Sequence, residues 1–252
     1  MGYAIQWVRS FVFFLNTYLS MLVLAIFFTP FAIFSRVWVY HAVHTYCRYV
    51  RWSAAWMVGL RSEIRGPVPT EEVLIASKHQ SFFDIIMIVS VVPKPKFIMK
   101  ASLRFAPILG WYAQRLGCVP VDRGKRAEAI RQMMKGVTDG TAPAGQLIIY
   151  PQGTRVNPEL YKPYKVGTYV LYKETGQKLI PAATNVGVFW RRTGIFRKPG
   201  LAVVEFLDPF EPGLEQKDFM ERLETVVEGR SKELMAEAGY DVSQIPGKPG
   251  RA

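Results

Sequence analysis

The chain has 252 residues, half of them apolar, which suits one globular domain of ordinary size plus an appendage. Lys and Arg outnumber Asp and Glu by 32 to 20, and the net charge of +12 indicates an anionic partner: nucleic acid, a phosphate-bearing substrate or an anionic lipid surface. The two cysteines, Cys47 and Cys118, lie far apart, which argues against a disulfide scaffold and favours a reducing compartment.

The N-terminal region predicts a membrane anchor. No charged residue occurs from Ser10 to Ser35, where Phe, Leu, Val and Ile dominate. A hydrocarbon core is spanned by about 20 apolar residues, and the stretch is too long for a typical signal-peptide core, with no small-x-small cleavage site after it. Pro30 is compatible with a kink, so a half-immersed hairpin and a full span both remain open. A buried helix of a soluble protein is disfavoured because such helices rarely stay uncharged for so long.

The next segment, Val37 to Leu60, predicts an interfacial amphipathic helix. It combines arginines with the aromatic residues typical of a membrane–water interface, namely Trp38, Tyr40, Tyr46, Tyr49, Trp52 and Trp56. Arginines follow the apolar run and place the rest of the chain in the cytoplasm, at the cytoplasmic (inner) membrane. His41, His44 and Cys47 lie on roughly one helix face, but with no obvious fourth ligand they favour interfacial packing over a metal site. We therefore assign residues 1–64 to the anchor and residues 65–252 to a second domain.

Beyond a turn-rich linker, Arg65 to Glu72, short apolar runs alternate with amphipathic helical patterns. The predicted strands are Val73–Ser77, Phe97–Met99, Val119–Val121, Leu147–Tyr150, Leu179–Asn185 and Leu201–Leu207. The predicted helices are Phe82–Val91, Ala106–Leu116, Lys125–Gly136, Val166–Glu174 and Lys217–Ala238. This alternation predicts an α/β domain with a central mixed sheet flanked by helices, preceded by the membrane-embedded helical anchor.

An ionisable pair stands between two apolar runs in "SKHQSFFDI", residues 77–85. On one regular helix, His79 and Asp84 would point to different faces. They can meet if His79 lies in a loop and Asp84 in the first turn of the following helix, where the carboxylate would fix the imidazole tautomer and leave one nitrogen as a base. Ser81 followed by Asp84 is equally consistent with a capping-box-like pair that only supports the helix start.

Two further turns follow predicted strands. "YPQGTR", Tyr150 to Arg155, offers backbone N–H groups, a hydroxyl and a guanidinium, which together can bind phosphate. In "GCVPVDRG", Arg123 leaves a short strand into a glycine turn. Taken alone, each turn is more typical of a surface loop with a solvated arginine than of a binding site.

Taken together, His-x-x-x-x-Asp, then Asp-Arg after a strand, then Pro-x-Gly-Thr-Arg after a strand, resemble the glycerophospholipid acyltransferase family. The nearest members are the bacterial 1-acylglycerol-3-phosphate (lysophosphatidate) acyltransferases. "LIPAATN" is similar to the family's final hydrophobic-Pro block, and "MKASLRFAPILGW" to its segment between the first two blocks. The likeness runs from about Val73 to Asn185. It implies phospholipid biosynthesis, in which an acyl thioester and lysophosphatidate give phosphatidate.

The resemblance also implies roles for individual residues. His79 would be the general base for the acceptor hydroxyl, and Asp84 would orient it. Pro181 would shape the acyl-donor side. The acceptor's phosphate would be held by Lys100, Arg123, Gly153, Thr154 and Arg155. Neither a metal nor a cofactor is expected; acyl-CoA or acyl carrier protein would supply the acyl group, membrane lipids would be contacted, and nucleic acid would not be bound.

One position departs from the family. Gln152 stands where the family usually carries Glu. The glutamine keeps a hydrogen-bonding carbonyl but lacks the charge, so the change affects acceptor identity more than reaction type. Other acceptors, such as a lyso-ornithine lipid or glycerol 3-phosphate, remain alternatives. A non-catalytic basic protein that binds membrane or nucleic acid is a further alternative, which the intact His79/Asp84 pair disfavours. "WRRTGIFRKPG", Trp190 to Gly200, is consistent with contact to lipid headgroups or an acidic carrier, or with a solvated loop.

Overall fold

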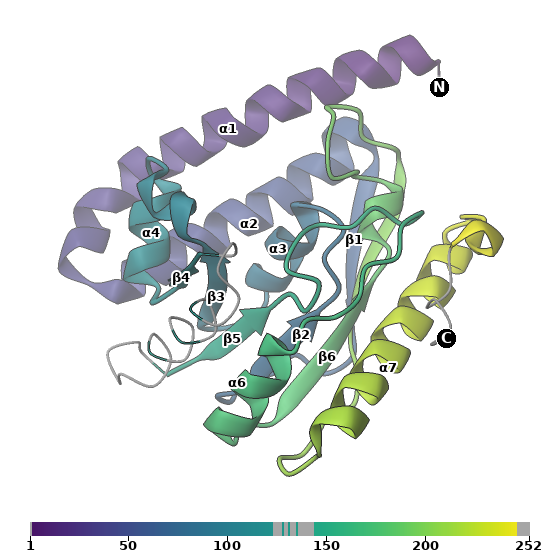
Figure 1. Cartoon of the computed structure of the whole chain (residues 1–252). Coiled ribbons are helices and arrows are strands. Elements are labelled where there is room, and N and C mark those ends of the chain that lie inside the picture. Colours follow the sequence, from purple (N-terminus) through teal and green to yellow (C-terminus); the bar gives the residue numbers. More distant parts are fainter. Residues whose placement is uncertain (1, 123–127, 129–130, 132–134, 136–143, 246–252) are drawn as a thin grey trace.

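The structure, a computed structural model, describes residues 2–122, 128, 131, 135 and 144–245 (Figure 1). Its helices are α1 (Tyr3–Phe34), α2 (Arg36–Val58), α3 (Phe83–Val89), α4 (Leu109–Arg115), α6 (Gly167–Thr175) and α7 (Gln216–Glu237). Its strands are β1 (Leu60–Arg65), β2 (Leu74–Ser77), β3 (Pro95–Lys100), β4 (Val119–Val121), β5 (Gln146–Ile149), β6 (Leu179–Thr184) and β7 (Gly200–Phe206). Short 3₁₀ helices occur at η1 (Ala101–Phe105), η2 (Val186–Val188) and η3 (Val242–Gln244).

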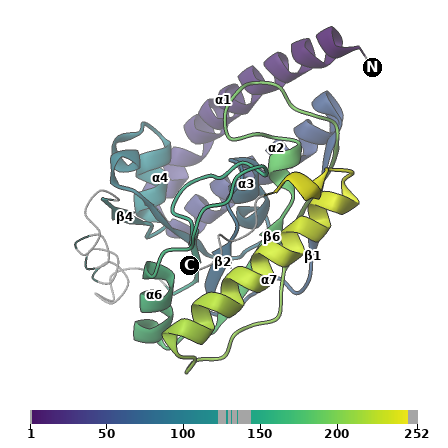
Figure 2. The ribbon, with the colours of Figure 1, turned by 45° about the vertical axis from the view of Figure 1, so that its right-hand side comes forward.

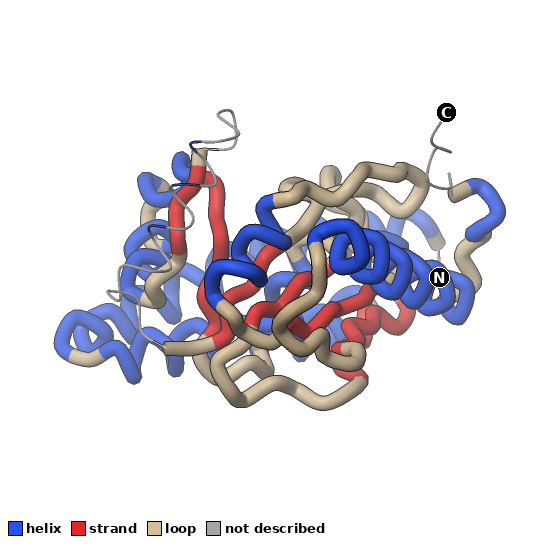
Figure 3. Tube along the Cα trace, turned by 60° about the horizontal axis from the view of Figure 1, so that its bottom comes forward, coloured by secondary structure: helices blue, strands red, loops and turns tan. Residues whose placement is uncertain are grey.

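The strands form one sheet in the order β1-β7-β6-β2-β5-β3-β4. All neighbours run parallel except β6 and β7, which are antiparallel. Helices lie on both sides of the strands (Figure 3). The predicted mixed sheet with flanking helices is therefore confirmed. Because β2 lies near the middle of the sheet, the loop that leaves its carboxyl end is positioned by strands on both sides.

Successive residues of β2 belong to different cores, as expected for a strand buried on both faces. Ile75 packs with α2 and α3 on one face of the sheet. Leu74 and Ala76 pack with α6 and α7 on the other, where Phe219 is fully buried. Figures 1 and 2 show α7 on the opposite side of the sheet from α2 and α3. This burial explains why the central strands read as unbroken apolar runs.

Helix α1 packs lengthwise against α2 and does not project away from the domain (Figure 1). Its buried residues recur every three to eight positions along one stripe: Gln6, Ser10, Phe13, Thr17, Ala25, Phe28 and Ala32. The opposite face exposes large apolar side chains such as Val12, Leu19 and Ile26. By length and composition α1 is able to cross a membrane, although a core helix or a signal sequence would meet the same criterion.

Polar contacts fasten α1 to the globular part. The Gln6 side-chain amide donates to the carbonyls of Val58 (3.0 Å) and Arg197 (2.8 Å). The backbone N–H of Arg197 donates to the Ser10 hydroxyl at 3.0 Å. These buried bonds lie in the part of α1 nearest the N-terminus, so that end of the apolar helix is bound to the loop before β7.

The strand β1 is absent from the sequence prediction. We expected the interfacial helix to continue to Leu60, but α2 ends at Val58 because Gly59 adopts a left-handed conformation with φ of 71°. The next six residues pair in parallel with β7 at the edge of the sheet. Only Leu60 and Ile64 of these six residues are apolar, so the alternation that indicates a half-buried strand is too sparse to be recognised. The predicted anchor boundary after residue 64 thus falls inside this strand.

The other predicted elements occur in the structure, with ends within three residues of the predicted ones, where the residues are described. The predicted helix Lys125–Gly136 lies largely outside the described residues. The 3₁₀ helix η1 lies between β3 and α4, a connection for which no structure was predicted.

Gly66, directly after β1, gives a test of how this edge is closed. Its φ is 73°, and an added Cβ would lie 2.0 Å from the Phe206 carbonyl oxygen. The Gly66→Ala variant should lose about 2–5 kcal/mol of unfolding free energy, from left-handed strain and the clash. The matched variant Gly176→Ala, with φ of 60° and no atom within 4 Å of the new methyl, should lose only about 1–2 kcal/mol. Denaturant unfolding in neutral detergent measures both, and equal losses would contradict the clash.

Candidate active site

The loop between β2 and α3 brings His79 and Asp84 together. The strand ends at Ser77 and the helix begins at Phe83, so the five-residue spacing crosses a turn in the chain and not a regular helix. The imidazole Nδ1 lies 2.9 Å from Asp84 Oδ1. A carboxylate only accepts, so Nδ1 is the protonated nitrogen and Nε2 keeps its lone pair. The pair therefore has the arrangement of an oriented base.

The second carboxylate oxygen of Asp84 supports the helix start. Oδ2 accepts the backbone N–H groups of Gln80 (2.8 Å) and Ser81 (2.7 Å). The Ser81 hydroxyl in turn accepts the N–H of Phe83 at 3.2 Å. Asp84 is fully buried. The two sequence interpretations, an imidazole orienter and a capping residue, therefore describe two oxygens of one side chain.

An aromatic ring holds the other side of the imidazole. Tyr150, the residue after β5, stacks on His79 with ring centroids 3.9 Å apart and planes 20° from parallel. Its hydroxyl is buried without a hydrogen-bond partner among the described residues. Burial raises the pKa of this hydroxyl well above 10, and the charge of Asp84 adds to the shift. Tyr150 thus stays neutral at working pH and contributes its ring, not a proton.

Contacts from other elements fix the loop. The His79 carbonyl accepts the N–H of Val156 at 2.8 Å, which ties the loop to the turn after β5. The Gln80 side-chain oxygen accepts the N–H of Gly187 at 2.9 Å. Behind the loop, the buried Lys78 ammonium pairs with Glu228 of α7. Removing either partner would leave an uncompensated buried charge, so the pair restrains the position of Lys78.

A cavity of about 500 Å³ lies between the N-terminal helices and the sheet domain. Most of its lining is apolar and comes from α1, α2 and the segment around α4. Phe82, next to α3, also lines it. The cationic part of the lining consists of Arg155, Arg192 and Arg197. A single-chain amphiphile with an anionic head has the matching distribution of apolar and charged groups.

The turn after β5 places its residues beside the His79 loop. The Gly153 N–H donates to the Tyr150 carbonyl at 2.8 Å, and Gly153 has a φ of 70°. Arg155 directs Nη1 to the Arg192 carbonyl at 3.2 Å and lines the cavity. Thr154 is partly exposed in the same turn. These three expected phosphate ligands therefore lie on a chain segment that binds the His79 backbone carbonyl through Val156 and stacks Tyr150 on the imidazole.

The remaining expected site residues are dispersed. Lys100 is exposed at the end of β3, two strands from β2, and does not line the cavity. Pro181 is buried within β6 opposite Ala76, and its carbonyl accepts the N–H of Leu207 at 2.9 Å. Arg123 lies outside the described residues. The structure thus unites His79, Asp84 and the turn after β5, but not the whole expected set.

Gln152 has a structural partner that a carboxylate would lack. Its side chain is buried, and its amide donates to the Lys162 carbonyl at 3.3 Å. A Glu at this position could not donate this bond. Gln152 therefore holds the segment that follows the phosphate-binding turn, while its own oxygen finds no partner among the described residues.

The sequence did not identify two buried residues at the cavity. Trp190 and Arg197 are 6% and 4% exposed, although the basic and aromatic segment around them is equally typical of a solvated loop. Their neighbours Arg191 and Arg192 are exposed, as such a loop would have them. The only signal in the sequence was that aromatic residues stand among basic ones in this segment. This composition does not indicate which side chains point into the protein.

The alternative metal site in α2 gains no support among the residues that the structure describes. No group of three or more His, Cys, Asp or Glu side chains there could hold a metal ion. His44 Nε2 lies 3.0 Å from the Val92 carbonyl oxygen, and His41 packs against the Trp38 ring. Cys47 is buried in the core between α2 and α3.

Comparison with known proteins agrees with this geometry. The family model described as Acyltransferase matches residues 60–185, half of the chain. The chain belongs to this family. The match begins at β1 and ends after β6, and it includes the His79 loop and the turn after β5.

Among relatives, the chain is 27% identical over 160 residues to the 1-acyl-sn-glycerol-3-phosphate acyltransferase of Pseudomonas aeruginosa, which covers 63% of this chain and 62% of that protein. It is 28% identical over 191 residues to the enzyme of the same name from Saccharomyces cerevisiae, covering 73% and 63%. The match therefore spans less than two thirds of the length of these relatives.

A solved structure shares the fold. The crystal structure of the 1-acyl-sn-glycerophosphate (LPA) acyltransferase from Thermotoga maritima superposes with a TM-score of 0.76 at 20% identity. The likeness covers 92% of this chain and 98% of that one, so it includes the N-terminal helices as well as the sheet.

The unpaired hydroxyl of Tyr150 gives a test of the site's packing. Removing a buried, unsatisfied hydroxyl removes a cost of about 1–3 kcal/mol, so Tyr150→Phe should be more stable than the wild type by up to that amount. Tyr172→Phe is the control, because its hydroxyl accepts the Leu214 N–H and donates to the Glu211 carbonyl; it should lose about 0.5–1.5 kcal/mol. Denaturant unfolding measures both, and a destabilised Tyr150→Phe would show that the hydroxyl has a partner.

Proposed function

We propose that the chain is a membrane-associated acyltransferase that transfers a fatty acyl group from an acyl thioester to the free hydroxyl of lysophosphatidate, giving phosphatidate. The observation that carries the proposal is the His79–Asp84 pair, oriented through Nδ1. Its loop is bonded through Val156 to the turn of Arg155, which lines a cavity with apolar and cationic residues. The names of the relatives, which are lysophosphatidate acyltransferases, support this reaction and acceptor.

The chemistry requires one base and anion-stabilising donors. His79 Nε2 takes the proton of the acceptor hydroxyl as its oxygen attacks the thioester carbonyl, forming the new C–O bond. The tetrahedral intermediate then collapses, the C–S bond breaks, and the leaving thiolate takes the proton from the imidazolium. Because a thioester is an activated acyl donor, the reaction needs neither a metal nor a covalent enzyme intermediate.

The charge pattern of the cavity supports a lipid acceptor. A phosphate near Arg155 would place the rest of a lysophospholipid within reach of the segment that bonds to His79 through Val156. Arginine suits this role because its planar fork can hold two phosphate oxygens at once. The donor is either acyl-CoA or acyl carrier protein, both of which present the acyl group as a thioester.

The exposed face of α1 supports a membrane-bound state. Apolar side chains continue from this helix to Leu103, Phe105 and Leu109 near α4, all at least 39% exposed. One face of α1 is bound to the domain, so we propose that the helix lies along the lipid surface with its other face immersed. The domain would face the cytoplasm at the inner membrane, the side indicated by the arginines that follow α1.

His79→Ala tests the mechanism. Loss of the base should reduce kcat by about 10²–10⁴-fold, while vesicle binding persists because the apolar face of α1 lies elsewhere. His41→Ala is the matched control, an exposed histidine of α2 that should retain activity. Acyl transfer and vesicle co-sedimentation are measured on purified protein. A folded His79→Ala protein with near-wild-type turnover would overturn the base assignment.

Arg155→Ala tests the acceptor. A hydrogen bond to an ion contributes about 1.5–3 kcal/mol, so kcat/KM for lysophosphatidate should fall roughly 10- to 150-fold, with little change in the KM of the thioester. Arg191→Ala is the control, since that exposed side chain pairs with Glu159 outside the cavity.

The same assay includes glycerol 3-phosphate and a lyso-ornithine lipid as acceptors, with acyl-CoA and acyl carrier protein as donors. A loss confined to the donor's KM would place Arg155 at the thioester carrier. A phosphate-free acceptor that outcompetes lysophosphatidate in the wild type would overturn the substrate assignment and leave the reaction type standing.

A further inference from the structure

Arg197 lies outside the sequence blocks that resemble the family, yet it is among the most buried charged side chains, with 4% exposure. It belongs to the loop between η2 and β7. Its backbone is held by α1, through Ser10 on the N–H and Gln6 on the carbonyl. The position of this residue is therefore set by the fold and not by solvent.

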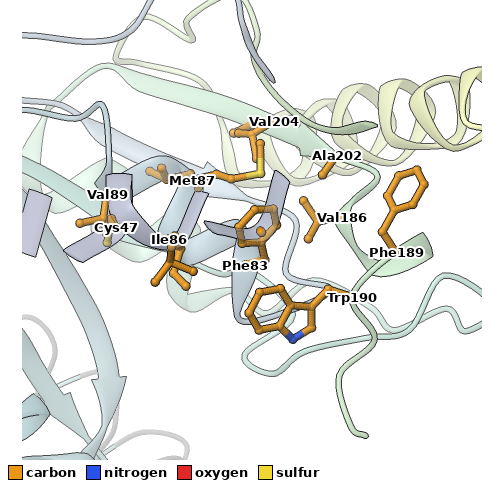
Figure 4. Packing of buried hydrophobic residues seen from close by; sticks show 14 of the residues in the cluster. Cys47, Phe83, Ile86, Met87, Val89, Val186, Phe189, Trp190, Ala202 and Val204 are labelled. Carbon is orange, nitrogen blue, oxygen red and sulfur yellow. The ribbon is translucent and has the colours of Figure 1, made fainter. Parts of the chain in front are cut away.

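The guanidinium lies over an aromatic ring. Its Cζ lies 4.1 Å from the Trp190 ring centroid. Trp190 is itself fixed by stacking on Phe83, with centroids 5.1 Å apart and planes 17° from parallel, and Figure 4 shows the two rings side by side. Phe83 directly precedes Asp84 in α3. Neighbouring residues of one helix therefore hold the Trp190 ring, on which the guanidinium lies, and the imidazole of the candidate base.

The guanidinium has few internal partners. Nη1 donates to the carbonyls of Gly194 (2.9 Å) and Phe196 (3.1 Å). Nε is buried with no partner, and no carboxylate lies within ion-pair distance of Arg197 in the described part of the chain. Burial lowers the pKa of the guanidinium to about 10, so it remains charged near neutral pH. A buried charge without a counterion is costly unless a ligand supplies one.

The cavity gives a ligand access to Arg197, which is part of its lining. Arg197 and Arg155 line it together, along with apolar residues of α1 from Phe14 to Ala25. That part of α1 covers roughly 16 Å at 1.5 Å per residue. Phe14 lies one turn from Ser10, which binds Arg197, while Ala25 lies one turn from Thr29, which bonds to Tyr112 of α4. The cation is therefore near one end of an elongated apolar lining.

We propose that Arg197 is a second phosphate-binding arginine, which together with Arg155 grips the phosphate monoester of a single-chain lipid whose apolar chain extends along α1. The proposal rests on the proposed function, since it names a further residue for the same acceptor. Two guanidiniums approaching from different loops would neutralise the two charges of a monoester, which a single arginine would leave half-compensated. The same chemistry would also accept the phosphodiester of a bilayer lipid, and the experiment separates the two sources.

Binding of dodecyl phosphate to the full chain tests the site without requiring catalysis. Arg197→Met keeps an unbranched apolar stem over Trp190 and removes the charge; Arg197→Lys keeps the charge and loses the fork. We expect dodecyl phosphate to bind the Met variant 10- to 150-fold more weakly than the wild type. The loss of affinity in the Lys variant should be smaller than in the Met variant. Arg191→Met, from the same loop but outside the cavity, should bind within about twofold of the wild type. Monododecanoylglycerol, a neutral amphiphile, should bind all four proteins alike.

The kinetic arm separates a ligand role from a packing role. With lysophosphatidate, Arg197→Met should raise the acceptor KM by the same 10- to 150-fold and leave the thioester KM nearly unchanged. A uniform loss of binding for charged and neutral amphiphiles, with a lower Tm in both Arg197 variants, would make the residue structural and overturn the proposal. Equal binding of dodecyl phosphate to wild type and Arg197→Met would also overturn it.

Two further measurements identify the source of the phosphate. They also distinguish failure of the phosphate-site proposal from failure of the proposed function. If Arg197→Met loses binding to phosphatidylglycerol vesicles relative to phosphatidylcholine vesicles but keeps dodecyl phosphate, the ligand is the bilayer phosphodiester and the acceptor assignment falls. If the wild type fails to acylate lysophosphatidate yet binds dodecyl phosphate through Arg197, the proposed function fails and the phosphate site stands.

Discussion

Three N–H donors converge on the carboxylate of Asp84, and the candidate site depends on this convergence. One donor is the His79 ring and the others are the backbone groups of Gln80 and Ser81. Because these residues are consecutive, satisfying one buried charge determines the loop conformation, the start of α3 and the orientation of the imidazole together. Replacing the acid would leave several buried donors unpaired, so a change here disturbs the fold and the chemistry at once.

The site combines two parts of different origin. The carboxyl end of the central strands supplies the base and its stacked aromatic, which are rigid because the sheet continues on both sides. The N-terminal helices supply most of the cavity that would hold an apolar chain. The loop around Trp190 joins the parts, since it packs on α3 and binds α1. The proposed acyl transfer from a thioester to a lysophospholipid would need such a junction, because the reacting atoms are polar and the acyl chains are not.

Structure that depends on neighbouring residues in the sequence could be predicted. Central strands buried on both faces gave apolar runs, and the His79–Asp84 pair could meet in only one local arrangement, a loop followed by a helical turn. Strand β1 was missed because it lies at an edge and has only two apolar residues, Leu60 and Ile64, which are too few for a clear alternation. The burial of Arg197 was missed because an arginine between basic residues normally faces solvent. Its backbone is bound by α1, which is distant in sequence, and its guanidinium lies over the Trp190 ring. The partner of Gln152, ten residues away, likewise depends on how a loop folds back.

The polar side chains on the buried stripe of α1 bear on how a water-soluble form of this protein can be obtained. Gln6 and Ser10 hold the loop that carries Arg197, and Phe13 fills the core beside Trp190. Deleting the helix to remove its apolar surface would therefore open the interior and release a loop of the cavity. Replacing the outward-facing Leu, Ile and Val side chains with Glu, Lys or Gln would instead keep every inward contact. The segment that resembles a detachable membrane anchor therefore forms, on its inner side, a wall of the cavity.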